Sequence, residues 1–243
     1  MDTYNNGKDL KISELIFTNF NVGKKVLRRF FKRLNNYAKF YFFELWISRH
    51  FKFRVAENLD DYLKAYQIRY EVYCEEYNYL NPKDYPNRLE KDQYDPHSEH
   101  FLINNSTKDI VAYVRLILNS KEGFPIEKHF KLDLKDFKID KNKTGEISRL
   151  IVSREYRRLH IILVLIKGLY KYVKVHGIEY IYSVMDDRLL NMLIKLGFPF
   201  RKIGPYTTYQ GITCPNILVV KEMEDNLRKR NNLLYRYLMR TLK

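Results

Sequence analysis

The chain has 243 residues, of which 45% are hydrophobic and 30% are charged, so it can bury a sizeable core and has the composition of a globular protein. No apolar run reaches the roughly 18 residues that a membrane-spanning helix needs, and two cysteines exclude a disulfide framework. With no signal peptide recognisable, we expect Cys74 and Cys214 to be reduced thiols in a cytoplasmic protein.

The formal net charge of +15 is concentrated near the two ends of the chain. Residues 1–50 hold 10 lysines and arginines against 4 acidic residues, and residues 221–243 hold 7 against 3. This pattern favours an anionic surface as a partner, such as lipid headgroups, an acidic protein or nucleic acid. No nucleic-acid-binding motif or basic stripe occurs in the middle of the chain, so nucleic acid is not expected.

Residues 24–47 predict a basic amphipathic helix with bulky aromatic side chains. Its apolar positions recur at steps of three and four, namely Leu27, Phe30, Phe31, Leu34, Ala38, Tyr41 and Leu45. Such a helix can lie on an anionic membrane surface, and the alternative is that its apolar side packs on the domain. We expect residues 1–50 to form a basic helical arm and residues 221–243 a basic C-terminal helix, on either side of one domain over residues 51–220.

The middle of the chain alternates between helical and β-rich patterns. The predicted elements are a helix over 60–77, a polar loop over 81–97, strands over 100–104, 109–118 and 146–152, a helix over 157–176, a strand over 178–184, a helix from 187 that ends at Gly197, and a strand over 216–220. Strands followed by a strand–helix–strand–helix–strand run indicate a mixed α/β sheet.

The order of strand, Arg-rich turn, helix, strand and a helix ending in "KLGF" resembles the GNAT acyltransferase fold. That resemblance implies a central strand that splays from its neighbour, with the pantetheine arm of an acyl donor along the exposed edge. It also implies a phosphate-binding turn at the start of the next helix. Most members have a Gly-rich turn there, whereas "EYRRLHI" has no glycine, which favours a donor with one phosphodiester over a nucleotide pyrophosphate.

Five stretches carry a narrower resemblance, in order, over roughly residues 55–215: "IRYEVYCEE", "YPNRLEKDQYDPHSEHFL", "VRLIL", "GFPIEKHF" and "EISRLIVSREYRR". They resemble the PEP-CTERM/exosortase system-associated acyltransferases, a group related to N-acyl amino acid synthases and acyl-homoserine lactone synthases. The resemblance implies transfer of a long-chain fatty acyl group from an acyl carrier protein thioester to the amine of an amino acid or similar small acceptor. Tyr77 and Tyr79 stand where lactone synthases usually show a Trp, so an S-adenosylmethionine pocket is not expected.

The resemblance also implies the residues that bind the acceptor. They are Arg69, Tyr73, Asp92, Tyr94, Asp95 and Arg115. Asp92 and Asp95 could hold the acceptor's ammonium group, or they could bind Arg69 and Arg115 and so shape the pocket. A carboxylate on the acceptor would suit one of those two arginines in a bidentate pair.

The chemistry of aminolysis assigns roles in the stretch "EISRLIV". Glu146 is the candidate general base, and Ser148 shares its strand face and could order a water. Burial would raise the pKa of Glu146 and a neighbouring guanidinium would lower it. Arg149 lies three residues on, on the opposite face of a regular strand, and is expected to organise loops unless a bulge intervenes at the splay.

The donor is expected along Leu150, Ile151 and Val152, with a backbone N–H near Leu150 or Ile151 meeting the oxyanion. Arg157 and Arg158 are expected to contact its phosphate or the carrier protein, and a solvated helix start is the alternative. The resemblance implies acyl carrier protein bearing a 4'-phosphopantetheine thioester as the donor, and acyl-CoA is the alternative. No tightly bound cofactor is expected.

Other interpretations of the same residues remain open. The Arg, Asp and Glu set could be a buried structural ion network. Asp92, Asp95, His97 and His100 fit no standard metal spacing, so no metal is expected, and no base is identifiable beside Cys74. The alternative functions are a CoA-dependent acetyltransferase, or a catalytically inactive basic lipid-binding protein. We expect a cytoplasmic protein, with peripheral association at the inner face of the membrane through residues 24–47 as a further possibility.

Overall fold

The computed structural model describes residues 38–159 and 161–240, and the chain divides into two compact units between Arg49 and His50. In the described part of the first unit, residues 38–49 are helical, and the side chains of Tyr41 and Phe42 are exposed. The rest of the predicted N-terminal arm, residues 1–37, lies outside the described residues.

The second unit is an α/β structure. Its strands are β1 (Lys52–Val55), β2 (Ser98–Asn104), β3 (Ile110–Leu118), β4 (Thr144–Val152), β5 (Tyr180–Met185), β6 (Arg201–Lys202), β7 (Thr207–Thr208) and β8 (Ile212–Val219). Its α-helices are α2 (Leu59–Tyr70), α3 (Pro125–His129), α4 (Ile162–Val175), α5 (Asp187–Leu196), α6 (Val220–Arg230) and α7 (Asn232–Met239). Shorter helical turns are η1 (Glu71–Glu76), η2 (Pro82–Asp84), η3 (Asp95–His97), η4 (Lys141–Lys143) and η5 (Arg154–Leu159).

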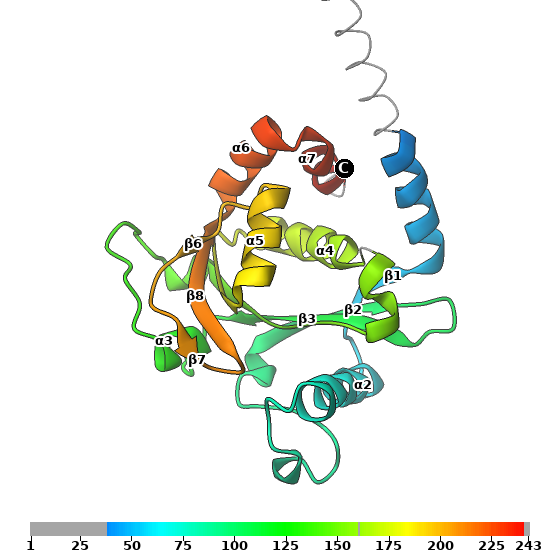
Figure 1. Ribbon diagram of the computed structural model, residues 1–243, viewed down its shortest axis with the longest axis vertical. Coiled ribbons are helices and arrows are strands. Elements are labelled where there is room, and N and C mark those ends of the chain that lie inside the picture. The colour runs from blue at the N-terminus through cyan, green and yellow to red at the C-terminus, as the bar shows by residue number, and fades with distance from the viewer. Residues whose placement is uncertain (1–37, 160, 241–243) are drawn as a thin grey trace, which may run out of the picture. The chain divides into compact units, whose positions relative to one another are not determined.

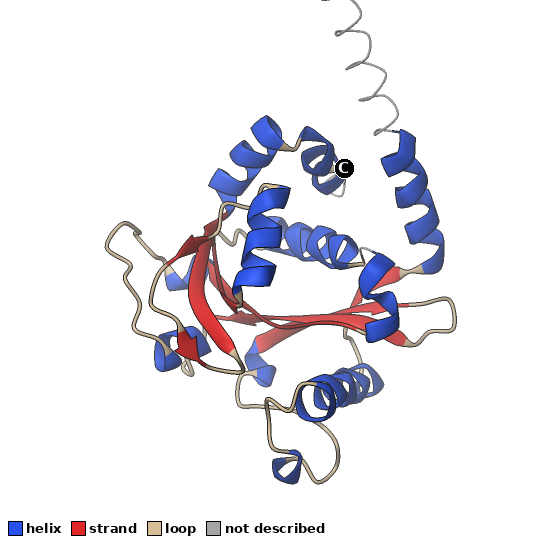
Figure 2. Ribbon diagram, in the orientation of Figure 1, coloured by secondary structure: helices blue, strands red, loops and turns tan. Residues whose placement is uncertain are grey.

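The strands form one mixed sheet in the order β1-β2-β3-β4-β5-β8-β6, and β7 pairs with β8 off this path. The paired strands run antiparallel except β4 and β5, which are parallel and are joined through α4, as a parallel connection requires. Figures 1 and 2 show α4 and α5 on one face of the sheet and α2 on the other. This arrangement confirms the mixed, open α/β sheet predicted from the sequence.

Alternating side chains on the first strands build a core on each face of the sheet. Phe101 packs against Tyr172 of α4, with the ring centroids 5.3 Å apart, whereas Leu102 is buried with Ile68 of α2. Both residues are fully buried, so the sheet is covered on both sides at β2.

The sheet opens between β4 and β5. Their parallel pairing runs from Thr144 with Tyr180 to Ile147 with Ser183 and then stops, although β4 continues to Val152. On its other side β4 stays paired with β3 as far as Val152. One edge of β4 beyond Ile147 is therefore free of a neighbouring strand, which is the predicted splay.

A β-bulge lies directly in this free stretch. The register passes from Arg115 opposite Ser148 to Tyr113 opposite Ile151, so two residues of β4 face one residue of β3. Arg149, one of the two, has a φ of 54°, in the left-handed region. The bulge removes the alternation that would place Arg149 on the face opposite to Glu146.

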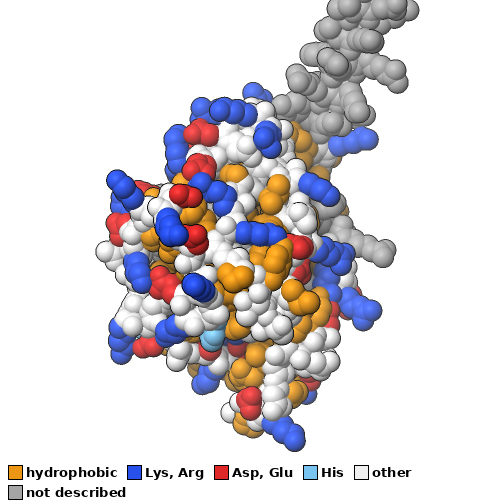
Figure 3. Space-filling model, turned by 60° about the vertical axis from the view of Figure 1, so that its left-hand side comes forward, with side chains coloured by type: hydrophobic (Ala, Val, Ile, Leu, Met, Phe, Trp, Pro, Cys, Tyr) orange, Lys and Arg blue, Asp and Glu red, His pale blue; other side chains and the backbone are white. Residues whose placement is uncertain are grey.

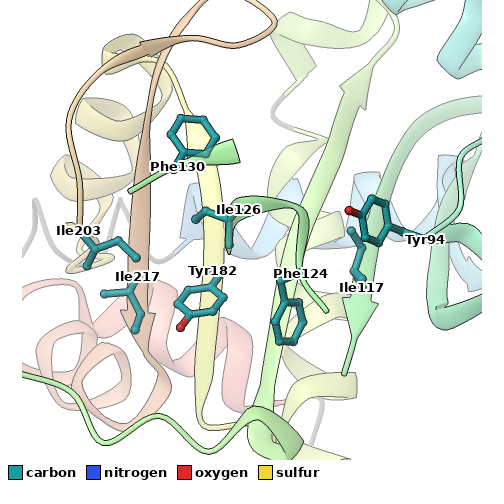
Figure 4. Close-up of a cluster of buried hydrophobic side chains, with 8 residues drawn as sticks. All are labelled: Tyr94, Ile117, Phe124, Ile126, Phe130, Tyr182, Ile203 and Ile217. Atoms are coloured by element: carbon teal, nitrogen blue, oxygen red, sulfur yellow. The ribbon is translucent and has the colours of Figure 1, made fainter. Parts of the chain in front are cut away.

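A second core lies beside α3 and gathers side chains from loops and strands far apart in the sequence (Figure 4). It consists of Tyr94, Ile117, Phe124, Ile126, Phe130, Tyr182, Ile203 and Ile217. This apolar cluster surrounds the start of α3, where the backbone N–H of Ile126 points at β4. The backbone N–H that reaches the site described below is therefore set among apolar side chains.

Several elements differ from the prediction. The helix predicted from residue 157 starts at Ile162, because residues 154–159 form the separate helical turn η5. The helix predicted over 60–77 loses α-helical geometry at Glu71 and ends as the π-helical turn η1. Gly197 ends α5 as predicted, with a φ of 107° that favours glycine.

Candidate active site

A central cavity of about 270 Å³ passes through the sheet where β4 and β5 part. At one end its wall includes Glu146, Ser148, Arg149, Asp92 and Arg115. At the other end the wall is apolar and comes from α4, α5, β5, α6 and the segment after α5, with Leu165, Leu169, Leu189, Leu193, Val184, Met185, Phe198, Val220 and Met223. The cavity thus joins a charged pocket on the α2 face to an apolar channel on the α4 face.

Glu146 lies at the parting point of the strands and lines the cavity, although it is only 3% exposed. Its Oε2 accepts a hydrogen bond of 3.0 Å from the backbone N–H of Ile126. Burial raises the pKa of Glu146 to about 8, and the hydrogen bond from Ile126 opposes that shift. A carboxyl with this pKa can hold or release a proton near neutral pH, as general acid–base catalysis requires.

Ser148 follows Glu146 on the same face, and its side chain is fixed by Arg115. The Nε of Arg115 donates to Oγ of Ser148 over 2.9 Å, which leaves the serine hydroxyl proton available to a further acceptor. Both side chains line the cavity beside Glu146. The geometry is therefore compatible with a water or a substrate oxygen held between Ser148 and Glu146.

Three guanidinium groups and three carboxylates form a charge-balanced cluster next to this pair. They belong to Arg69, Arg115, Arg149, Glu90, Asp92 and Asp95. Because opposite charges alternate within hydrogen-bonding distance, each group stabilises the ionised form of its neighbours.

Arg69 is fully buried at the end of α2 and holds the loop that follows η2. Its Nε donates to Oε2 of Glu90 over 2.5 Å and its Nη1 to Oδ1 of Asp95 over 2.6 Å. Its Nη2 has no hydrogen-bond partner in the part of the chain that the structure describes. Arg69 has no exposed surface and is not among the residues that line the cavity, so in this structure its contacts are with the loop that borders the pocket.

Arg115 on β3 makes a bidentate pair with Asp92, with Nη1 to Oδ1 at 2.7 Å and Nη2 to Oδ2 at 2.9 Å. Its Nη1 also donates to Oδ1 of Asp95 over 2.6 Å. Of the two roles expected for Asp92 and Asp95, the geometry matches the one in which they bind Arg69 and Arg115. The Asp92 side chain is still 24% exposed and lines the cavity, so it can face an acceptor as well.

Glu90 joins the bulge to α2, and the sequence patterns did not single it out. Its two carboxylate oxygens accept from Nη2 and Nε of Arg149, at 2.9 Å and 3.1 Å, and Oε2 also accepts from Arg69. Burial opposes the ionisation of Glu90, but the guanidinium groups of Arg149 and Arg69 outweigh it and lower the pKa to about 2. In the sequence, only the position of Glu90 two residues before Asp92 in "LEKDQYD" could have suggested a role in the site, because its partners Arg69 and Arg149 are distant in the sequence.

Arg149 is the guanidinium of the cluster nearest to solvent. Its side chain is 10% exposed, against 0% for Arg69 and 1% for Arg115. The ring of Tyr73, in the π-helical turn η1, lies over it with the ring centroid 4.9 Å from Cζ. Among the described residues no hydrogen bond reaches its Nη1, whereas Nε and Nη2 are engaged by Glu90 and Asp92.

A second cavity of about 480 Å³ lies at the charged end and shares part of the wall of the first. The shared residues are Tyr79, Asp92, Tyr94, Arg149, Tyr209 and Gln210. The predicted binding residue Tyr94 is thus at the junction of the two cavities. This antechamber, bounded by the rings of Tyr79, Tyr94 and Tyr209, adjoins the cavity that Glu146 lines.

Asp95 and His100 form a buried hydrogen-bonded set with Tyr113. His100 Nδ1 lies 2.8 Å from the Tyr113 hydroxyl, and burial lowers the pKa of His100 to about 4, so the ring is neutral. In the described residues no group of three or more His, Cys, Asp or Glu is arranged to hold a metal ion. Cys74 and Cys214 are buried and not joined in a disulfide, and burial raises the pKa of the Cys74 thiol.

The residues expected at the acyl donor divide into two sets. Leu150 lines the cavity, whereas Ile151 is buried beneath α2 and Val152 pairs with Ala112 of β3. The guanidinium of Arg157 is engaged in a bidentate pair with Glu76, at 2.6 Å and 2.8 Å. The side chain of Arg158 lies outside the described residues.

Comparison with known proteins relates part of the chain to acyltransferases. Residues 68–167 match the family model described as an acetyltransferase (GNAT) domain. A protein of Rhodobacter capsulatus described as L-ornithine N(alpha)-acyltransferase is 28% identical over 144 residues, which are 55% of this chain and 55% of that protein. The chain therefore spans about half the length of this curated relative.

Solved structures support the same fold. A CoA-dependent acyl-homoserine lactone synthase, BjaI, with SAM and isopentyl-CoA, gives a TM-score of 0.60 at 18% identity over 74% of this chain and 83% of that one. FeeM, an N-acyl amino acid synthase from uncultured soil microbes, gives 0.54 at 15% identity over 72% and 94%. The fold is the GNAT fold, as predicted.

The distribution of charged and apolar side chains on the surface is relevant to the partners that the protein could bind. In the view of Figure 3, Lys and Arg side chains are spread over the surface among Asp and Glu, with apolar patches between them. No helix of the described residues is both long enough and apolar enough to span a bilayer.

Proposed function

We propose that the protein is an N-acyltransferase that moves a long-chain fatty acyl group from a thioester to the amine of an amino acid or a similar small acceptor. One observation carries this proposal: the cavity that runs from buried Glu146 through the parted sheet into an apolar channel. A thioester at the parting would place its acyl chain in the channel and its carbonyl beside Glu146. The match of residues 68–167 to the GNAT domain model supports an acyl thioester as the donor class.

In this reaction the acceptor arrives as an ammonium ion and must lose a proton before it attacks. Glu146, as carboxylate, takes that proton directly or through a water held by Ser148. The nitrogen then bonds to the thioester carbon, and a backbone N–H at the free edge of β4 stabilises the oxyanion. The C–S bond breaks, the nitrogen gives up its second proton to the leaving thiolate, and a thiol and an N-acyl product remain.

An amino acid fits the charged end of the cavity. We propose that Arg149 receives its carboxylate, because it is the most exposed of the three guanidinium groups and keeps Nη1 free of hydrogen bonds within the described residues. Asp92, 24% exposed and adjacent, would face the ammonium group. The name of the Rhodobacter relative, an L-ornithine N(alpha)-acyltransferase, supports the α-amine of an amino acid as the target.

For the donor we propose acyl carrier protein. The turn after β4 lacks the glycines that would bring several backbone N–H groups close to a pyrophosphate, and one phosphodiester needs fewer of them. The net charge of +15 favours docking of an acidic protein. Because BjaI is described as CoA-dependent, acyl-CoA is the alternative donor to test.

The motif order further supports membership in the PEP-CTERM/exosortase-associated group, and the basic arm over residues 1–50 supports peripheral binding to an anionic membrane. Both are parts of the proposal, as is the division into an arm, a domain over 51–220 and a C-terminal segment over 221–243. The structure corrects the single helix predicted for that segment, because α6 ends at Arg230 and α7 spans Asn232–Met239.

The experiment is an incubation of the full chain with a mixture of amino acids and long-chain acyl carrier protein, and separately with acyl-CoA and acetyl-CoA. Mass spectrometry of the organic extract should show N-acyl amino acids with the carrier-protein donor. Product from acetyl-CoA alone would favour the acetyltransferase alternative. No amide product with any donor would refute the proposal.

A further inference from the structure

We infer that helix α6 forms the floor of the acyl channel and that Met223 on this helix limits the length of the acyl chain. The inference rests on the proposed function and makes it more specific. It concerns a part of the chain that lies beyond residues 68–167, the stretch matched by the family model.

The cavity itself carries this assignment. Glu146 and Ser148 line one part of its wall, and Val220 and Met223 line another part of the same cavity. The apolar part also includes Leu169, Leu193 and Phe198, which come from α4, from α5 and from the segment just after α5. A chain that starts at the parting of β4 and β5 and follows the apolar wall therefore runs toward α6.

Both residues of α6 are firmly placed. Val220 and Met223 are each 4% exposed, and α6 begins directly where β8 ends. Glu224, the next residue, accepts a hydrogen bond of 2.8 Å from the Tyr170 hydroxyl of α4 and pairs with Lys174 at 2.8 Å. These bonds tie α6 to α4, so the floor is fixed to the wall and is not a loose terminal segment.

The same helix face supplies a matched control. Val220, Met223 and Leu227 recur at steps of three and four and are all buried. Leu227 does not line the cavity and packs instead against Gly197, where an added Cβ would come within 2.9 Å of its side chain. Truncation of Leu227 should therefore cost packing, as truncation of Met223 does, without changing the channel.

The test measures binding of a series of straight-chain acyl-pantetheine thioesters of increasing length to the full chain. Each methylene that enters an apolar channel should increase affinity roughly fourfold, until the chain reaches the floor and the increase stops. Met223→Trp should move that limit to shorter chains and reduce binding of the longest accepted chain by at least about fourfold. Met223→Ala should move the limit to longer chains.

Leu227→Ala should leave the limit where it is in the wild type, and thermal unfolding of each variant checks that it is folded. If Met223→Trp fails to fold, the chain-length limits of Met223→Ala and Leu227→Ala are compared instead, and only Met223→Ala should differ from the wild type. Affinity that does not depend on chain length, or a limit unchanged in the Met223 variants, would overturn the inference. Length-dependent binding that shifts with Met223, without any amide product, would sustain the floor and refute the proposed reaction instead.

Discussion

At the residue scale, Glu146 combines a carboxyl group with nearly complete burial, at 3% exposure. Apolar side chains around Ile126 lie on one side of it, and only one backbone N–H donates to it among the described hydrogen bonds. Burial accordingly raises its pKa to about 8, from an ordinary value of 4.5. Glu146 is thus a stronger base than an exposed carboxylate. Its raised pKa must also make the free energy of unfolding depend on pH.

The first prediction concerns pH. Because the folded pKa of Glu146 lies above the unfolded one, the folded chain retains a proton that the unfolded chain has lost between pH 4.5 and about 8. This contribution to stability is complete below pH 4.5 and is lost by about 1.4 kcal/mol per pH unit as the pH rises toward 8. Glu146→Gln has no such group, so urea unfolding should show the wild type losing stability relative to this variant across that window. A difference that stays constant with pH would contradict the assigned burial.

The second prediction concerns Glu90, the carboxylate shared by Arg69 and Arg149. Glu90→Gln leaves two buried guanidinium groups without their common partner and should lower the free energy of unfolding by about 3–5 kcal/mol. Glu75→Gln removes an ion pair with Arg88 whose side chains are 40% and 62% exposed, and should cost no more than about 1 kcal/mol. Equal effects of the two substitutions in urea titrations would show that the cluster does not hold the loop.

The residue types of the site could be predicted from the sequence better than their contacts could. Arg115 binds Asp92 and Asp95, which is one of the two roles that the sequence predicted for these aspartates. Glu90 was missed because Arg149, its partner, is 59 residues away and is turned toward it by a bulge that no local pattern announces. Arg157 forms an ion pair with Glu76, which is 81 residues away in the sequence, so the local pattern of the turn could not predict it.

At the element scale, α4 lies close against β1 because residue 168 has no side chain. A Cβ built on Gly168 would lie 2.1 Å from the ring of Phe53, far inside van der Waals contact. Phe53 in turn stacks on Phe101 of β2, with the ring centroids 5.7 Å apart, so it has little room to move.

The third prediction uses this contact. By helix propensity alone, Gly168→Ala would stabilise α4 by about 1 kcal/mol. The clash with Phe53 should outweigh that gain and destabilise the fold by about 1–3 kcal/mol net. Thermal unfolding measures the sign, and Phe53→Leu in the Gly168→Ala background should recover part of the loss. A Gly168→Ala protein more stable than the wild type would show that α4 does not pack as described.

Periodicity and turn residues were enough to predict the strands of the central sheet and the end of α5 at Gly197. They did not predict β1, because this edge strand has only the residues Lys52–Val55 and is defined by its pairing with β2. The late start of α4 also escaped them, since its first residues carry no side-chain cap. The parting of β4 from β5 came from the family resemblance and not from any pattern in the residues.

At the scale of the whole molecule, the basic N-terminal residues and the residues of the proposed active site lie in different parts of the chain. The excess of lysine and arginine in residues 1–50 lies outside the stretch that matches the GNAT domain model. The chemistry of the proposed reaction needs only the second unit, whose cavity and charged cluster lie wholly after residue 50. Membrane binding and acyl transfer should therefore be separable.

The fourth prediction tests that separation in the full chain. Replacing Lys24, Arg28, Arg29 and Lys32 by Gln should weaken binding to vesicles rich in anionic lipid, by about 1 kcal/mol for each charge that reaches the surface. Acyl transfer between soluble substrates should stay unchanged. Sedimentation with anionic vesicles measures the binding, and neutral vesicles serve as the control. Unchanged binding to anionic vesicles would remove the N-terminal residues from any membrane role.

The central claim is that an acyl thioester lies at the parting of β4 and β5 with Glu146 positioned to deprotonate an amine. Its most direct test is a single-turnover measurement of amide formation from acyl carrier protein and an amino acid, with wild type and Glu146→Gln compared at equal donor occupancy. We predict that Glu146→Gln binds the donor as the wild type does and forms the amide about 10²–10⁴ times more slowly. Amide formation at the wild-type rate by Glu146→Gln would contradict the claim.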